Sequence, residues 1–405
     1  MLDHVGRPEM KKSGATGRDG LPEGRSVALD VFRGMCVAGM ILVTDPGTYS
    51  AVSPQLLHAT WHGATATDMI FPGFLFAVGV AIPIAIGSRL RRGETTLRLL
   101  LGLSRRMLLL IGVGLMLNGY PQFALRSLRI PGVLQRIGLC YFAAAVIYLA
   151  TAAWAGWRRR LALGLTALAL LVGYGLMLLF VPVPAFGAGH LDTWRSLPAY
   201  VDRAVFTVAH LWSYGLTPGV GVTFDPEGLL STVPAIASVL VGVLAGEVLL
   251  VDLPARTSSE QRRMLWGGMV AGVLLIGLGL ALDPVMPIIK KLWTPSFAFL
   301  SSGVSLLIFL LCFWVIDRLG VRRGLTVARV FGTNAIVAFA VSGLLTSMMD
   351  VLEAGGMNWH AWGYRHLFLP WMPPVHASLL YAICVVGVNG LLLGVLYRQR
   401  IFVKL

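Results

Sequence analysis

Runs of about twenty apolar residues recur along almost the whole 405-residue chain. A helix that crosses the hydrocarbon core of a bilayer needs roughly 20 such residues, and all of its backbone groups must be satisfied internally. Ten runs of this size occur, near residues 28–46, 66–87, 100–118, 130–152, 161–182, 229–250, 264–282, 297–316, 328–349 and 377–397. The sequence therefore predicts an all-α, polytopic membrane protein with about ten transmembrane helices.

Composition excludes the other broad classes of protein. Only 13% of the residues are charged, about half of what a soluble domain usually carries. The glycines follow no period and there are only 4 cysteines, which excludes collagen and a disulfide scaffold. We predict a single transmembrane domain over residues 25–405. The polar residues 1–24 lack the apolar stretch of a signal peptide and predict a disordered tail.

The 33 Lys and Arg residues are divided unequally between the two sides of the predicted bundle. With the N-terminus inside, 24 of them fall on the inner side and seven on the outer side, and Arg33 and Arg136 lie within spans. Positive residues mark the cytoplasmic side of a membrane protein. We therefore predict that both termini are cytoplasmic and that the loops 47–65, 183–228 and 350–376 face outward. Orientation explains most of the net charge of +14, so no nucleic-acid partner is expected.

A polar cluster lies where the first outward loop enters the second span. His58, Trp61, His62 and Asp68 occur there within eleven residues. Because His can accept and return a proton near neutral pH, and a carboxylate can set its tautomer, His58 and Asp68 are candidate catalytic residues. The alternatives are an interfacial belt anchored by Trp61 and a metal site on the two histidines. No third ligand has matching spacing, so we expect no metal.

Two arginines within spans are further candidates, because a charge inside a bilayer is costly. Arg33 follows Asp30 by three residues, on the same helix face. It either pairs with Asp30 or contacts an anion at the cytoplasmic mouth. Arg136 keeps its proton and so needs an anionic partner or water. The partner of Arg136 is either a side chain in a structural ion pair or the phosphate or carboxylate of a ligand, and the sequence leaves both alternatives open.

Polar residues also mark the sixth and ninth spans. Asp225 is predicted to cap a helix that has Pro226 as its first residue and Glu227 in its first turn. The Thr333-Asn334 pair lies within the ninth span, and Ser301-Ser302 lies within the eighth. Hydrogen bonds between helices would explain these last two pairs.

Five short motifs follow one another from about residue 25 onward: Leu29-Asp30-Val31-Phe32-Arg33-Gly34; His58-Ala59-Thr60-Trp61-His62-Gly63 leading into Asp68-Met69-Ile70-Phe71-Pro72; Arg129-Ile130-Pro131-Gly132-Val133-Leu134-Gln135-Arg136; Asp225-Pro226-Glu227-Gly228; and Thr333-Asn334. Each alone is weakly specific. In this order along a ten-span chain, they resemble the heparan-α-glucosaminide N-acetyltransferase family, which includes bacterial relatives. Its lysosomal members are expected to carry an additional N-terminal region and span.

The resemblance implies transfer of an acetyl group from acetyl-CoA to the amino group of a glucosamine-type sugar, free or in a glycan. The protein is then a multi-pass enzyme of the inner (cytoplasmic) membrane that acts at the outer face, and a homodimer is compatible with it. The family's catalytic histidine falls on His58, as general base or as acetyl carrier. We assign CoA contacts to Arg33, Arg129, Gln135, Arg136 and Asn334, and acceptor contacts to Asp45, Trp61, His62, Asp225 and Glu227.

The sequence departs from the family pattern at two positions near His58. Thr44-Asp45 stands where a polar Asn is expected, and His62 follows the tryptophan where lysosomal members have Asn. The acceptor sugar is therefore open. A proton-coupled sugar transporter would also suit intramembrane Asp, Arg and His residues, although no inverted repeat is evident. An O-acyltransferase of envelope glycans would differ only in its acceptor.

Overall fold

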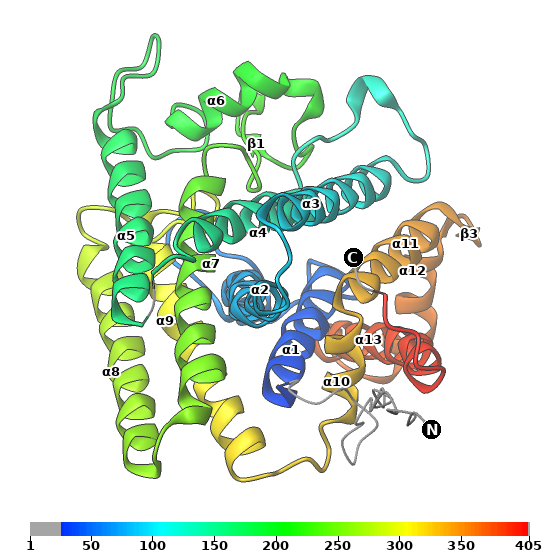
Figure 1. Cartoon of the computed structure of the whole chain (residues 1–405). Coiled ribbons are helices and arrows are strands. Elements are labelled where there is room, and N and C mark those ends of the chain that lie inside the picture. The colour runs from blue at the N-terminus through cyan, green and yellow to red at the C-terminus, as the bar shows by residue number, and fades with distance from the viewer. Residues whose placement is uncertain (1–25, 155, 404–405) are drawn as a thin grey trace, which may run out of the picture.

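The structure, a computed structural model, describes residues 26–154 and 156–403, and helices make up most of them (Figure 1). Nine described helices are long and apolar enough to cross a membrane, and a bent helix pair brings the number to ten. The predicted all-α polytopic fold with about ten spans is thereby confirmed. The predicted tail, residues 1–24, lies outside the described residues.

The first five spans begin at capping residues or at glycine. The Ser26 side chain accepts a hydrogen bond from the Leu29 amide, and Thr95 does the same for Arg98. Such caps satisfy backbone donors that have no partner within the helix. These helices are α1 (Val27–Thr44), α2 (Ala66–Arg91), α3 (Thr96–Gly119), α4 (Val133–Ala150) and α5 (Trp157–Phe180).

The later spans are longer than their apolar runs. α8 begins six residues before the predicted run, because Thr257 and Glu260 form a capping box in the polar segment ahead of it. α7 and α9 continue as π-helical turns over Glu247–Asp252 and Phe313–Arg318. The helices are α7 (Thr232–Gly246), α8 (Ser258–Leu282), α9 (Pro295–Cys312), α10 (Thr326–Thr333), α11 (Ala335–Val351) and α13 (Pro374–Arg398).

The ninth predicted span is broken. α10 and α11 meet at Asn334 with a bend of 88°. The Asn334 side chain donates to the carbonyl of Ile401 and accepts from the amide of Val403. The predicted contact between helices at this asparagine is instead a contact between the bend and the C-terminal segment.

The two long loops carry the short strands and the remaining α-helices. α6 (Leu197–Phe206) and the antiparallel pair β1 (Leu216–Thr217) and β2 (Gly221–Val222) lie between α5 and α7. The antiparallel pair β3 (Glu353–Ala354) and β4 (Met357–Asn358) and helix α12 (Trp359–Gly363) lie between α11 and α13. Short 3-10 or π turns cover Pro54–Leu56, Leu125–Ser127, Val208–His210, Leu253–Ala255, Tyr364–Phe368 and Leu369–Trp371.

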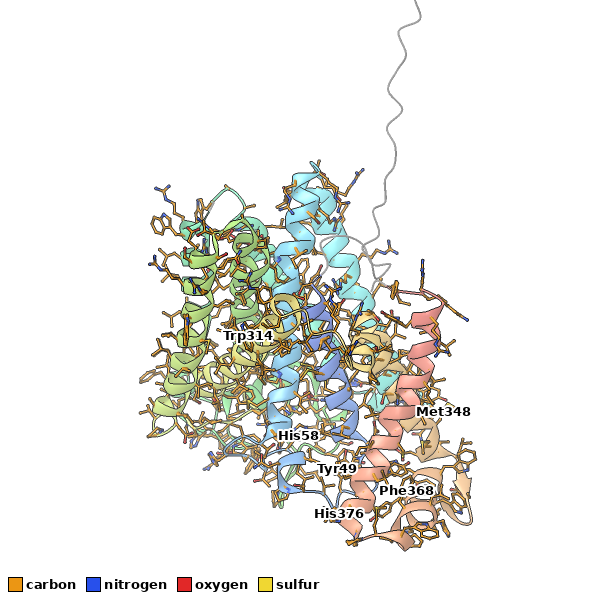
Figure 2. The ribbon with its side chains drawn as sticks, turned by 90° about the horizontal axis from the view of Figure 1, so that it is seen from below. Tyr49, His58, Trp314, Met348, Phe368 and His376 are labelled. Carbon is orange, nitrogen blue, oxygen red and sulfur yellow. The ribbon has the colours of Figure 1, made fainter. Side chains whose placement is uncertain are left out.

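The polar cluster of the first loop lies at one end of the bundle. Figure 2 shows Tyr49, His58, Phe368 and His376 gathered at that end, which we call the His58 end. α2 runs from this end to its basic last turn at Arg89 and Arg91. The charge distribution predicts that the His58 end faces outward, and this orientation stays a prediction.

Helix α2 lies in the middle of the bundle, with α1, α4 and α7 around it (Figure 1). Its contact with α7 brings two backbones together. A Cβ atom on Gly242 of α7 would overlap the Phe76 carbonyl oxygen of α2, and one on Gly79 would overlap the Val239 carbonyl oxygen. Small residues allow this approach in membrane helices, so these two glycines fix the distance between α2 and α7.

The predicted helix cap at Asp225 is wrong. α7 starts at Thr232, with Ser231 as its N-cap residue. The Asp225 carboxylate instead accepts hydrogen bonds from the Glu227 and Trp212 amides and from the guanidinium of Arg129. Partners distant in the sequence therefore hold this aspartate in a turn ahead of the helix.

Candidate functional site

The loop between α1 and α2 presents His58 beside the first turn of α2. The Thr65 hydroxyl donates to the carbonyl of Leu57, the residue just before the histidine, at 2.7 Å. The Ala59 amide donates to the Asp68 carboxylate at 3.0 Å. His58 is thus flanked on both sides by backbone groups tied to the start of α2.

His58 and Asp68 form a direct pair. The His58 Nδ1 atom lies 2.7 Å from the Asp68 Oδ1 atom, and the second oxygen of Asp68 accepts from the Thr65 amide at 2.9 Å. Asp68 is fully buried, whereas the His58 side chain is 49% exposed. Because a carboxylate accepts hydrogen bonds, this contact directs the Nδ1 proton to Asp68 and leaves the Nε2 lone pair available.

Lys290 also lies at this pair, although in the sequence it is only one of the seven Lys and Arg residues predicted on the outer side. Its Nζ atom lies 3.3 Å from Asp68 Oδ1 and 2.9 Å from His58 Nδ1. Burial lowers the pKa of Lys290, and the charges of Asp68 and Glu227 oppose that effect. Only its place in a short loop beside a span could have singled it out.

The predicted acceptor residues Trp61 and His62 lie on the same loop. The Trp61 indole donates to the Leu191 carbonyl at 2.8 Å and packs edge-on against Phe224, with 5.1 Å between ring centroids. His62 is exposed. The first of these rings is therefore fixed by the long α5–α7 loop, while the second faces solvent.

Arg129, Asp225 and Glu227 are brought together as one cluster. Arg129 binds both oxygens of Asp225, at 2.6 and 2.8 Å, and an oxygen of Glu227 at 2.6 Å. Burial would raise the pKa of Glu227, but Arg129 outweighs it and holds the pKa below its ordinary value. The assigned CoA and acceptor roles of these residues stay predictions, since the structure pairs the three with one another.

Arg136 is almost entirely buried, with 1% exposure. It donates to the Gly228 carbonyl at 3.1 Å and to the Ser231 hydroxyl at 2.5 Å, and it lies over the Trp293 ring. Its Nε and Nη1 atoms make no hydrogen bond to the described residues. Its neighbour Gln135 donates to the Ile130 carbonyl at 3.1 Å.

Asp45 pairs with α11, and none of its described hydrogen bonds is to His58. Its carboxylate accepts from the Thr346 hydroxyl at 2.6 Å and the Ser342 hydroxyl at 3.2 Å. Burial raises the pKa of Asp45, and these hydroxyl groups oppose the shift. Its predicted acceptor contact stays a prediction, as does the predicted CoA contact of Asn334.

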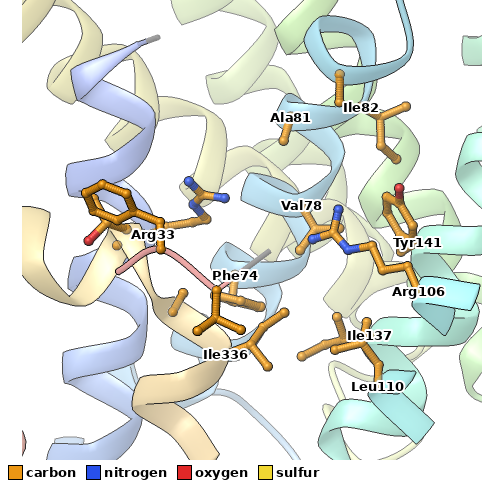
Figure 3. Close-up of a pocket in the computed structure, with 16 residues that line it drawn as sticks. Arg33, Phe74, Val78, Ala81, Ile82, Arg106, Leu110, Ile137, Tyr141 and Ile336 are labelled. Carbon is orange, nitrogen blue, oxygen red and sulfur yellow. The ribbon is translucent and has the colours of Figure 1, made fainter. Parts of the chain in front are cut away.

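A cavity of about 310 Å³ lies between α1, α2, α3, α4 and the α10–α11 bend. Arg33 enters it from α1 and Arg106 from α3, and their guanidinium groups point into the same space (Figure 3). Arg33 also pairs with Asp30 at 2.7 Å, as one alternative predicted. The Arg106 Nε atom is buried without a hydrogen-bond partner among the described residues, and the group lies 4.4 Å from the Tyr141 ring centroid.

Arg106 was not among the predicted site residues. Because Arg105 precedes it and both lie near the start of the third span, the sequence indicates only a cytoplasmic charge. Within residues 26–154 and 156–403, no group of three or more His, Cys, Asp or Glu side chains could hold a metal ion.

A buried carboxylate that interacts electrostatically with Asp225 of the Arg129 cluster makes stability depend on pH. Asp202 of α6 accepts from the Leu229 amide at 2.8 Å, and burial raises its pKa to about 7. The unfolded group loses its proton near 3.8, so stability falls as the pH rises from about 4 to 7. We expect Asp202→Asn to reduce the dependence of stability on pH. At pH 8, the melting temperature of this variant should be higher than that of wild type. Thermal unfolding in detergent at pH 5 and 8 measures this, and an unchanged slope would contradict it.

The chain is similar in sequence to two curated mammalian proteins. No family model matches it. It is 30% identical over 350 residues to the heparan-alpha-glucosaminide N-acetyltransferase of Homo sapiens, covering 75% of this chain and 50% of the relative. It is 29% identical over 362 residues to the protein of the same name from Mus musculus, covering 78% and 52%.

The chain spans about half the length of the curated relatives it matches. The matched part nevertheless covers at least three quarters of this chain, so the similarity extends well beyond the five short motifs. The resemblance seen in the five motifs and the similarity along the chain agree. The chain belongs to the heparan-alpha-glucosaminide N-acetyltransferase family.

Proposed function

We propose that this protein is an integral-membrane acetyltransferase that moves the acetyl group of acetyl-CoA to the amino group of a glucosamine-type sugar at the outer face. The observation that carries the proposal is the His58–Asp68 pair, in which a buried carboxylate fixes one nitrogen of a half-exposed histidine. The names of the relatives supply the reaction class. The pair supplies a group able to perform it.

The chemistry requires a base or a nucleophile at the position of the free Nε2 atom. A sugar amine is largely protonated near neutral pH and must lose a proton before it attacks the thioester. In a direct transfer, His58 Nε2 takes that proton. In a two-step transfer, Nε2 carries the acetyl group first. Trapping an acetylated His58 in the absence of an amine would establish the second route.

The cavity between α1 and α3 is the proposed site for the phosphates of CoA. Arginine suits phosphate because its guanidinium keeps its charge and offers several donors in one plane. Arg33 and Arg106 supply two such groups at one cavity. Since the pantetheine arm is an extended chain, we propose that it runs from this cavity toward the His58 end, with Arg136 as the predicted contact nearer that end.

Arg106→Leu is expected to raise the KM for acetyl-CoA about 10- to 100-fold with little change in kcat. A hydrogen bond to a charged group contributes about 1.5–3 kcal/mol, and a loss of binding alone appears in KM. The measurement is CoA release at varied acetyl-CoA concentration. Arg105→Leu is the matched control, because Arg105 is exposed on the same helix. Equal shifts in the two variants would indicate a general surface-charge effect and contradict the assignment.

Release of free CoA thiol tests the proposed function directly. Membranes that contain the protein should release thiol from acetyl-CoA only when glucosamine is present, and N-acetylglucosamine should form in equal amount. Glucose, which lacks the amine, serves as the matched acceptor. Thiol release with glucose would indicate an O-acyltransferase. Uptake of labelled glucosamine into vesicles without thiol release would indicate a transporter.

A further inference from the structure

The segment between α8 and α9 is fastened to the His58 loop. The Gly63 amide donates to the Ile288 carbonyl at 2.8 Å, and Gly63 and Ile289 form a parallel β-bridge. Lys291, which follows Lys290 in this segment, donates from Nζ to the Thr60 carbonyl at 2.7 Å. Two loops from distant parts of the chain therefore hold Lys290 at a fixed place beside His58.

The ammonium of Lys290 lies close to both nitrogen atoms of the His58 ring. Its Nζ atom is 2.9 Å from Nδ1 and 3.4 Å from Nε2, and the side chain is 14% exposed. Because the Nδ1 proton is directed to Asp68, the lysine and the histidine both donate to the same carboxylate oxygen. An ammonium has three donors, so Lys290 retains hydrogens for a group bound next to Nε2.

We propose that Lys290 is a catalytic residue whose ammonium stabilises the negative charge that develops on the thioester oxygen of acetyl-CoA. The inference rests on the proposed function and deepens it. The attacking nitrogen, His58 Nε2 or the acceptor amine, bonds to the carbonyl carbon while the C=O π electrons move to oxygen beside Lys290. The carbonyl then re-forms, the C–S bond breaks, and CoA leaves as a thiolate. In direct transfer, the proton of the amine passes through His58 Nε2 to this thiolate. In two-step transfer, the acetyl group stays on Nε2 until the acceptor amine attacks it, and the proton released by the amine then balances the charge of the thiolate.

The surroundings of Lys290 suit this task. Asp68 of α2 and Glu227 of the segment before α7 face it as carboxylates, whereas Arg136 of α4 and the adjacent Lys291 add positive charge. A fixed and mostly buried donor, such as Lys290, stabilises a developing charge more strongly than a donor in bulk solvent. Arg129 is occupied by two carboxylates. Among the cations in this region, Lys290 is the one whose Nζ lies within hydrogen-bond distance of the His58 ring.

Lys290→Met tests the inference against Lys291→Met, which removes an equal charge from the adjacent residue. Loss of one oxyanion donor reduces kcat about 10²- to 10³-fold. We expect that loss in Lys290→Met, with the KM for acetyl-CoA and the melting temperature unchanged. The fold decrease in kcat for Lys291→Met should be less than about one tenth of that for Lys290→Met, since the Nζ atom of Lys291 bonds to a backbone carbonyl. Equal kcat in Lys290→Met and wild type would overturn the inference and leave the proposed function standing.

Chemical rescue keeps the test informative if Lys290→Met folds poorly. Lys290→Cys treated with 2-bromoethylamine regains an ammonium at nearly the original distance from the backbone, and we expect at least a tenfold recovery of kcat. Wild type treated in the same way controls for modification of Cys384, which is exposed. Modified, folded protein without recovery would overturn the inference. If wild type releases no CoA under any condition, the proposed function fails and the inference with it.

Discussion

Replacement of His58 by Ala is expected to reduce amine-dependent CoA release about 10²- to 10⁴-fold. That range corresponds to the contribution of a positioned base to a proton-transfer step. The loss should appear in kcat, because the half-exposed ring lies above a carboxylate that the backbone already holds. For the same reason, the melting temperature of the variant should stay close to that of wild type.

His376→Ala is the matched control for this experiment. His376 lies at the same end of the bundle (Figure 2), is exposed, and stands in the first turn of α13. Its removal should leave CoA release within about twofold of wild type, since an isolated surface substitution has little effect. Full activity of His58→Ala in well-folded protein would refute the catalytic assignment. It would also remove the reason to place the thioester beside Lys290.

Gly242→Leu is expected to prevent stable folding of the bundle. The first added carbon would overlap the Phe76 carbonyl oxygen, so α7 would have to move away from α2 along its length. Overpacking a core usually costs about 1–3 kcal/mol and occasionally more. Here the clash is with backbone, which cannot change rotamer. The yield of monodisperse protein in detergent and its melting temperature should both fall sharply.

Gly112→Leu provides the comparison for that prediction. Gly112 is also in the middle of a spanning helix, α3, but a Cβ atom there would meet nothing within 4 Å. The same substitution should therefore leave the melting temperature unchanged or slightly higher, because Leu favours a helix more than Gly does. Similar losses in both variants would mean that the α2–α7 contact is not the cause.

Spans and local pairs were predictable because their signals are local in sequence. Ten apolar runs gave the helices, since each run is matched to the bilayer independently of the others. The Asp30–Arg33 pair follows from a three-residue helical spacing. The contact of His58 with Asp68 spans only ten residues, across a loop and a helix start.

Contacts between distant segments could not be predicted in this way. Lys290 is 232 residues from His58 in sequence, and its loop contains no sequence motif from which a contact with His58 could be predicted. Asp225 has the sequence of a helix cap, but Arg129, 96 residues away, binds its carboxylate in a turn. Local propensity is a weak guide where a buried ion pair competes for the same side chain.

The contacts of the bend at Asn334 make residues 401–403 part of the proposed cofactor pocket. Both side-chain hydrogen bonds of Asn334 go to the backbone of Ile401 and Val403, and Val403 lines the same cavity as Arg33 and Arg106. Deleting residues 401–403 would therefore remove one wall of that cavity. The same deletion would remove the two hydrogen bonds of Asn334 at the bend. For expression, a cleavage site or affinity tag is better placed ahead of α1 than against this C-terminal segment.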